Sequence, residues 1–388
     1  MILDFLSPVA KEVVAHAKLQ DKQSLGNVIS FYQKESEFPE IKKGSVVIIG
    51  VLENRNDINY LGEKLSFNEF RKAFVELFPG NWSAEIVDAG DIKPGETVAD
   101  TYFALKKVVE AVIKLGAIPF VLGGSQDLSY GMYRAYDNLD QMVNMVSVDA
   151  KFDLKDPSEG IKNNNYMNSI IVDEPNNLIN FSNIGFQTYY NSQEEIDLLE
   201  KLYFEAYRLG EVTNNLSLIE PLTRDADLVS FDITSIQASE LSNGIGYRSP
   251  NGFTGKEACA IARYAGVSNT VSSFGVFEMN AKMSASGVML IAQMLWYFIE
   301  GVHCRIVEPS LSADNAYKKY IVPSQDYDFV FYESQISNRW WVKLPDNEQE
   351  NNNIKKHSLL SCTQEDYLIA CDQQIPKRIY KAFRKNLI

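Results

Sequence analysis

The chain of 388 residues contains only three histidines, and none of them lies between His16 and His303. Imidazole is a frequent metal ligand and general base, so the long central part of the chain lacks a residue on which many hydrolytic centres depend. The four cysteines, at positions 259, 304, 362 and 371, form no CxxC motif and show no zinc-binding spacing. They predict reduced thiols, with Cys259 in the core, which is typical of a cytoplasmic protein.

Basic charge is also scarce, because 37 Lys and Arg stand against 51 Asp and Glu, for a net charge of −14. We therefore expect no nucleic-acid partner and no anionic membrane surface. The one basic cluster, Lys377 to Lys385, predicts a solvated terminal helix. Long apolar runs are lacking too: Val288 to Val302 is interrupted by Gln293 and Glu300, which predicts a buried helix rather than a membrane span. The N-terminus lacks the basic start of a signal peptide.

Apolar strand-like segments alternate with helix-like segments through the middle of the chain. The β-branched run Ser45 to Gly50 and the run Ile118 to Leu122 predict buried strands, and Val98 to Leu115 predicts a long helix closed by Gly116. Such alternation indicates a three-layer α/β/α fold with a mostly parallel sheet. We expect an N-terminal helical arm over residues 1–44, with Phe5, Val9 and Val13 on one helix face. The α/β domain is expected over 45–303, and a C-terminal extension over 304–388.

Acidic residues stand where three of the predicted strands end, and a glycine-rich segment follows a fourth. Asp149 and Asp153 follow one strand, Asp232 ends another, and Glu278 follows a third, while the segment from Gly123 to Gly131 follows a fourth. Ligands of parallel α/β sheets bind beyond the carboxyl ends of the strands. The sequence therefore predicts that these carboxylates converge on one site.

These four segments resemble the motifs of the ureohydrolase (arginase, agmatinase and formimidoylglutamase) family. Gly123 to Gly131 is similar to the family's Gly-Gly-Asp-His-Ser-Leu-Ser-x-Gly, and Asp149 to Asp153 to its Asp-Ala-His-x-Asp. Ser230 to Thr234 is similar to Ser-Phe-Asp-x-Asp, and Glu278 to Ala281 to Glu-x-Asn-Pro. The resemblance runs from about residue 45 to 303. It implies the fold predicted above, a site for two Mn²⁺ ions, and contact of Glu278 with the substrate.

Three of the six metal-ligand positions that the resemblance implies are replaced in this chain. Asp149, Asp153 and Asp232 match, whereas Gln126 and Lys151 stand in place of the two histidines and Thr234 in place of the last aspartate. A Lys ammonium repels a metal ion, and amide and hydroxyl oxygens are weak ligands for Mn²⁺. We expect a salt-bridge cluster, with Lys151 within ion-pair range of at least one of these aspartates. The alternative is a residual site for a single divalent cation, Mn²⁺, Mg²⁺ or Ca²⁺.

Two functions follow from this pattern. The first is a pseudoenzyme that acts by binding, with Glu278 facing a small amine or guanidine. The second is an active C–N hydrolase of a linear amidine or guanidine, such as formimidoylglutamate or agmatine, with an altered or single-metal site. The extension contains two strand-like segments, Asp328 to Glu333 and Arg339 to Lys343, that predict a hairpin. We expect it to bury Trp340 or Trp341 against the domain or a neighbouring subunit and to leave an adjoining apolar patch exposed as a surface for a protein partner. A homo-oligomer is a further expectation from the family.

Overall fold

Ten strands form one central sheet in the part of the chain that the structure describes. The structure, a computed structural model, describes residues 4–60, 62–82, 84–139, 141–158, 160–242, 247–311, 313, 315–324, 328–344 and 359–386. The strand order is β1-β4-β3-β5-β10-β9-β6-β7-β8, and β2 also pairs with β4. Only β1 is antiparallel to its neighbour. The strands are β1 (Leu6–Ser7), β2 (Ser30–Phe31), β3 (Val46–Val51), β4 (Ile86–Ile92), β5 (Ile118–Gly123), β6 (Val143–Val148), β7 (Leu178–Phe186), β8 (Glu205–Arg208), β9 (Leu228–Asp232) and β10 (Ser273–Phe277).

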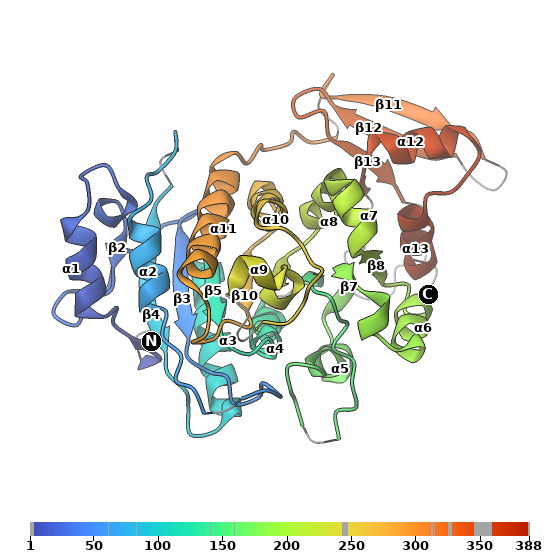
Figure 1. Cartoon of the computed structure of the whole chain (residues 1–388). Coiled ribbons are helices and arrows are strands. Elements are labelled where there is room, and N and C mark those ends of the chain that lie inside the picture. The colour runs from blue at the N-terminus through green and yellow to red at the C-terminus, as the bar shows by residue number, and fades with distance from the viewer. Residues whose placement is uncertain are drawn as a thin grey trace.

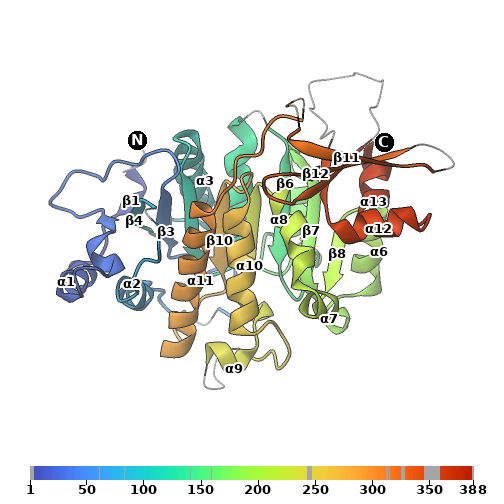
Figure 2. The same ribbon diagram turned by 90° about the horizontal axis from the view of Figure 1, so that it is seen from above.

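Helices cover both faces of this sheet, so the predicted three-layer α/β/α fold is confirmed (Figures 1 and 2). The central strands are buried along their whole length, as expected for a parallel sheet enclosed on both faces. One face packs against α2 (Asn68–Val75), α7 (Leu209–Asn214), α8 (Ile219–Arg224), α9 (Ala238–Leu241), α10 (Gly255–Val267) and α11 (Ala285–His303). The other packs against α3 (Val98–Lys114), α4 (Leu128–Arg134), α5 (Tyr166–Val172) and α6 (Gln193–Lys201).

Helix α11 has the length and composition of a membrane-spanning helix. Half of its apolar stretch is nevertheless buried inside the protein, where it packs against α10. Close packing of the two helices depends on glycine, because a Cβ on Gly266 would lie 2.2 Å from the carbonyl oxygen of Phe298. The helix therefore contributes its apolar side chains to the core of the α/β domain.

The N-terminal segment differs from the predicted helix. Helix α1 covers Lys11–Leu19, so Phe5 and Val9 precede it and the prediction of a helix through both was wrong. Proline fixes the chain at position 8, and β1 forms just before it as an edge strand on β4. Strands β7 and β8 were also not predicted, because polar residues such as Asn180 and Asn183 interrupt the apolar pattern of β7.

The C-terminal extension folds into a second, antiparallel sheet with the order β11-β12-β13-β14. Its elements are β11 (Tyr317–Val322), β12 (Phe329–Ser334), β13 (Trp340–Lys343), β14 (Leu359–Cys362), α12 (Gln364–Cys371) and α13 (Lys377–Asn386). The predicted hairpin is the pair β12 and β13. Trp340 is buried, but its ring stacks on Tyr320 and Tyr367 of the extension itself and not on the α/β domain. The half-buried Trp341 is the tryptophan that faces the domain, where its ring lies against Arg224.

Two arginines join the extension to the α/β domain. Arg224, at the end of α8, donates to the backbone carbonyls of Trp340 and Cys362 and lies 4.5 Å from the centre of the Trp341 ring. Arg378 on α13 pairs with Asp225 at 2.8 Å and with Glu205 of β8 at 3.3 Å. Helix α13 therefore lies against the edge strand of the central sheet.

Candidate functional site

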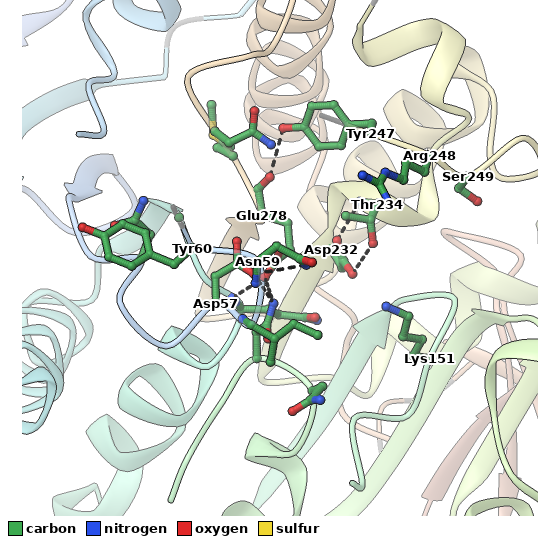
Figure 3. A pocket seen from close by; sticks show the side chains of 18 of the residues that line it. Asp57, Asn59, Tyr60, Lys151, Asp232, Thr234, Tyr247, Arg248, Ser249 and Glu278 are labelled. Atoms are coloured by element: carbon green, nitrogen blue, oxygen red, sulfur yellow. Dashed lines mark hydrogen bonds between the residues drawn. The ribbon is translucent and has the colours of Figure 1, made fainter. Parts of the chain in front are cut away.

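Four neighbouring central strands, β5, β10, β9 and β6, end at the same edge of the sheet and supply the predicted site residues. A cavity of about 800 Å³ opens there, and Gln126, Lys151, Asp153, Asp232, Thr234 and Glu278 all line it (Figure 3). Asp149 is almost fully buried and lies next to Asp153. The structure therefore brings every residue of the sequence-predicted site to one place.

Two of the site carboxylates stand on backbone in the left-handed region, where residues with a side chain are uncommon. The φ angle is 53° at Asp153 and 66° at Glu278. The Glu278 backbone is held on both sides, because its N–H donates to the Gly124 carbonyl and its own carbonyl accepts from the Tyr247 hydroxyl at 3.0 Å. Such strain costs on the order of 1–3 kcal/mol per residue and persists where the surrounding structure imposes it.

Glu278 lines the cavity and is held by two hydrogen bonds. Its Oε1 accepts from the Gln126 backbone N–H at 2.9 Å and from Asn163 Nδ2 at 3.0 Å, whereas Oε2 accepts no hydrogen bond within the described residues. The same Asn163 amide donates to Asp57 at 3.2 Å. Burial raises the pKa of Glu278 well above its ordinary value, and the charges of Asp232 and Asp57 raise it further. A cationic group placed at Oε2 would relieve this cost.

Sequence reasoning missed Asn163 and Asp57, which join two loops over the cavity. The Ile58 backbone N–H donates to Asn163 Oδ1, and the Asn163 backbone N–H donates to the Asn56 carbonyl. The run of three asparagines from Asn163, between a strand and a helix, was the available signal. Nothing in the sequence marked Arg248, which also lines the cavity.

The three matching aspartates are buried with few donors. Burial raises the pKa of Asp153 to about 7 and that of Asp232 to about 8, and it raises the pKa of Asp149 well above its ordinary value. Asp149 Oδ2 has no hydrogen-bond donor within the described residues and faces the Asp153 carboxyl group. Two carboxyl groups in such contact are stable when they share a proton.

Lys151 is not a member of a salt-bridge cluster, so that prediction was wrong. The side chain is exposed to the cavity, and its ammonium forms no ion pair with any described residue. The aspartate oxygens are bonded elsewhere: both oxygens of Asp232 accept from Thr234 at 2.6 Å, and Asp149 Oδ1 accepts from the Lys151 backbone N–H. Burial lowers the pKa of Lys151, but the charges of Asp153, Asp232 and Asp149 raise it more, so the ammonium stays protonated.

The fold and the converging acidic strand ends define an α/β protein of the arginase class. The model of the Arginase family matches residues 44–300, which is most of the chain, and the protein belongs to that family.

Its curated relatives and solved neighbours include formimidoylglutamases. The chain is 24% identical over 229 residues to formimidoylglutamase of Staphylococcus epidermidis, an alignment that covers 57% of this chain and 73% of the relative. Trypanosoma cruzi formiminoglutamase, solved with Mn²⁺, superposes with a TM-score of 0.60 and 22% identity over 68% of this chain and 94% of its own. Bacillus subtilis arginase superposes with a TM-score of 0.56 and 16% identity, over 66% and 98%.

Proposed function

We propose that this arginase-family protein binds a small cationic ligand in its strand-end cavity and does not assemble the two-metal centre of a ureohydrolase. The observation that carries the proposal is the Lys151 ammonium, which projects into the cavity beside the three retained aspartates. A fixed cation at that place opposes the entry of a divalent ion, since a dinuclear centre needs ligands that neutralise two dications.

The remaining donors support the same proposal. Thr234 donates to both oxygens of Asp232, which leaves them fewer lone pairs for a metal ion, and Gln126 offers only a neutral amide. Within the described ranges, no three His, Cys, Asp or Glu side chains are grouped so that they could hold a metal ion. The residues present therefore do not fit a pair of Mn²⁺ ions, and we route no chemical step through one.

Glu278 gives the cavity its ligand preference. One of its oxygens is fixed by Gln126 and Asn163, and the other is free to accept from an amine, amidine or guanidinium N–H. A charge-assisted hydrogen bond to a buried carboxylate is stronger than a bond between neutral groups. We expect this carboxylate to contribute most of the affinity for a cation.

The test combines metal analysis with ligand binding. The purified protein is loaded with Mn²⁺, desalted and assayed by elemental analysis, and agmatine binding is then measured by calorimetry with and without EDTA. We expect well under two ions per chain and binding that EDTA does not change. Two tightly held ions per chain, together with urea release or formamide release from a guanidine or amidine substrate, would refute the proposal.

One observation favours the second candidate, an active C–N hydrolase with a single metal ion. Within the described residues the buried Asp149 Oδ2 accepts no hydrogen bond and faces the Asp153 carboxyl group, and an oxygen in this position is a potential metal ligand. In that case Asp149 and Asp153 would hold one Mn²⁺, Mg²⁺ or Ca²⁺ ion, which would supply Lewis-acid activation of a water. Hydrolysis by protein that holds no more than one metal ion per chain, and its loss in Asp149→Asn, would favour this candidate.

Partner binding and self-association stay predictions. The extension leaves Ile321 and Ile336 more than half exposed, at 56% and 59%, beside its folded core. We propose that this surface serves a protein partner, and that the protein works in the cytoplasm. Light scattering of the full-length chain and of Ile321→Ser would show whether the residue supports an oligomer.

A further inference from the structure

Asn163 joins three separate segments of the chain beside the cavity. Its Nδ2 donates to Asp57 Oδ1 at 3.2 Å and to Glu278 Oε1 at 3.0 Å, and its Oδ1 accepts from the Ile58 backbone N–H at 3.2 Å. Its backbone N–H donates to the Asn56 carbonyl at 3.1 Å. One residue therefore connects the loop after β3, the segment before α5 and the end of β10.

The asparagine amide suits these partners because it carries two N–H donors on one nitrogen and a carbonyl acceptor beside it. The two groups that accept from Nδ2 are the carboxylates of Asp57 and Glu278, which lie close enough for their charges to repel one another (Figure 3). A shared donor offsets part of that repulsion. An alanine would offer no donor here, and an aspartate would add a third negative charge.

Asn163 projects from a turn that the neighbouring Asn165 holds in place. The Asn165 side chain is almost fully buried. It accepts from the Lys162 backbone N–H at 2.7 Å and donates to the Gly160 carbonyl at 3.0 Å. The position of the Asn163 amide is therefore set by its own segment and does not depend on the loop that it contacts.

The loop of residues 54–60 depends on Asn163 for the attachment of its tip. Within the described residues, every hydrogen bond that leaves residues 57–60 for another segment ends at Asn163. The other hydrogen bonds of these residues close the turn itself. Ile58 and Tyr60 are exposed, at 56% and 39%, so apolar burial adds little to the attachment. Because the loop lines the cavity, Asn163 holds one of its walls.

Asn163 also sets the orientation of the Glu278 carboxyl group. The Oε1 atom accepts from Asn163 and from the Gln126 backbone N–H at 2.9 Å, which leaves Oε2 as the oxygen without a donor among the described residues. The terminal torsion of a glutamate is soft, so one hydrogen bond alone would allow the carboxyl group to turn. A carboxylate that is already oriented binds a cation with less loss of conformational entropy.

We propose that Asn163 is a positioning residue, which directs Glu278 Oε2 at the cationic ligand and closes the loop of residues 54–60 over it. This inference rests on the proposed function and deepens it, because the ligand and the loop then depend on the same amide. Ligand binding should stabilise the loop, and loss of the amide should weaken binding through Glu278.

Calorimetric titration of the full chain with agmatine tests the action on Glu278. Asn163→Ala should weaken binding about 10-fold or more, as loss of one hydrogen bond to a charged group would give. Glu278→Gln should weaken binding too, but the two losses should not multiply: the double variant should bind no more than about 3-fold more weakly than Glu278→Gln alone. Asn164→Ala is the matched control and should keep the affinity. Asn164 is also half-buried, and its side chain forms no hydrogen bond with any residue that the structure describes.

Hydrogen exchange of the Ile58 amide tests the closure of the loop. Saturating agmatine should slow this exchange about 10-fold in the unmodified protein, a comparison that needs no variant. In Asn163→Ala the amide should exchange rapidly, and agmatine should not slow it. Unchanged exchange in β3 and β5 shows that the variant keeps its fold.

The outcomes separate this inference from the proposed function. If Asn163→Ala binds agmatine as well as the unmodified protein does, or if its loss multiplies in full with that of Glu278→Gln, the positioning role is refuted and cation binding stands. Equal weakening by Asn164→Ala, or agmatine that leaves Ile58 exchange unchanged, also refutes the inference alone. If the unmodified protein does not bind agmatine, the proposed function fails and this inference fails with it.

Discussion

Arg378 is expected to control the attachment of the extension to the α/β domain. Its guanidinium is almost fully buried and pairs with Asp225 and Glu205, whose side chains are 27% and 5% exposed. Arg378→Met would leave the Glu205 carboxylate buried without its cation, while solvent partly rehydrates Asp225. Removal of one partner of a buried pair costs about 3–5 kcal/mol, and the exposure of Asp225 places the expected loss near the lower end.

A loss of about 3 kcal/mol raises the population of the detached extension by roughly 100-fold. Native-state hydrogen exchange measures this directly, because detachment exposes the amides of β14 and α13 before the central sheet unfolds. Protection of these amides should fall by about that factor, with β3 and β5 unchanged. Lys377→Met, one residue earlier on the same helix and exposed, is the control. Equal exchange rates in the two variants would show that Arg378 does not hold the extension.

The remaining predictions concern the site and the pH dependence of stability. Lys151→Met should change the free energy of unfolding by less than about 1 kcal/mol in urea titrations, because the ammonium forms no ion pair with any residue that the structure describes. A loss of about 3 kcal/mol would show instead that Lys151 belongs to a buried salt-bridge cluster. Burial raises the pKa of Asp227 to about 7, so the folded state binds more protons than the unfolded state between about pH 4 and 7, and this group lowers stability as the pH rises. Asp227→Asn keeps an acceptor for the Asn144 N–H and should remove this pH dependence of stability. Urea unfolding across pH should show the variant to be about 2–4 kcal/mol more stable at pH 8. An unchanged dependence of stability on pH would contradict this. Deletion of residues 304–388 should lower solubility and produce higher mass by light scattering, since it uncovers β8; a soluble, folded product of unchanged oligomeric state would show that the extension is dispensable.

The sequence predicted those strands whose residues are buried on both faces of the sheet. Strands such as β3 and β5 are buried on both faces, so their apolar runs stand out, and the acidic residues that follow them lie together because parallel strands end at one edge. Strand β7 was missed because Asn180 and Asn183 serve polar partners, Glu205 and the Lys151 carbonyl, which no local pattern reveals.

The error at Lys151 has a comparable cause. The sequence shows which charged residues share a site. Whether Lys151 pairs with an aspartate also depends on the other donors to its oxygens, and both oxygens of Asp232 accept hydrogen bonds from Thr234. Arg248 gave no signal for a related reason. It reaches the cavity from the segment between α9 and α10, which carries no strand-end pattern, and only the folded chain places it in the same cavity as Thr234.

The position of helix α13 at the end of the chain has a consequence for folding during synthesis. Edge strand β8 is complete once residue 208 has been synthesised, whereas the helix that lies against it, through Arg378 and Lys381, is made more than 160 residues later. During that interval the nascent chain presents an unpaired strand edge, the feature that most readily templates association between chains. Yield in the cell should therefore depend on chaperones that cover this edge during synthesis, even though the finished protein shields it.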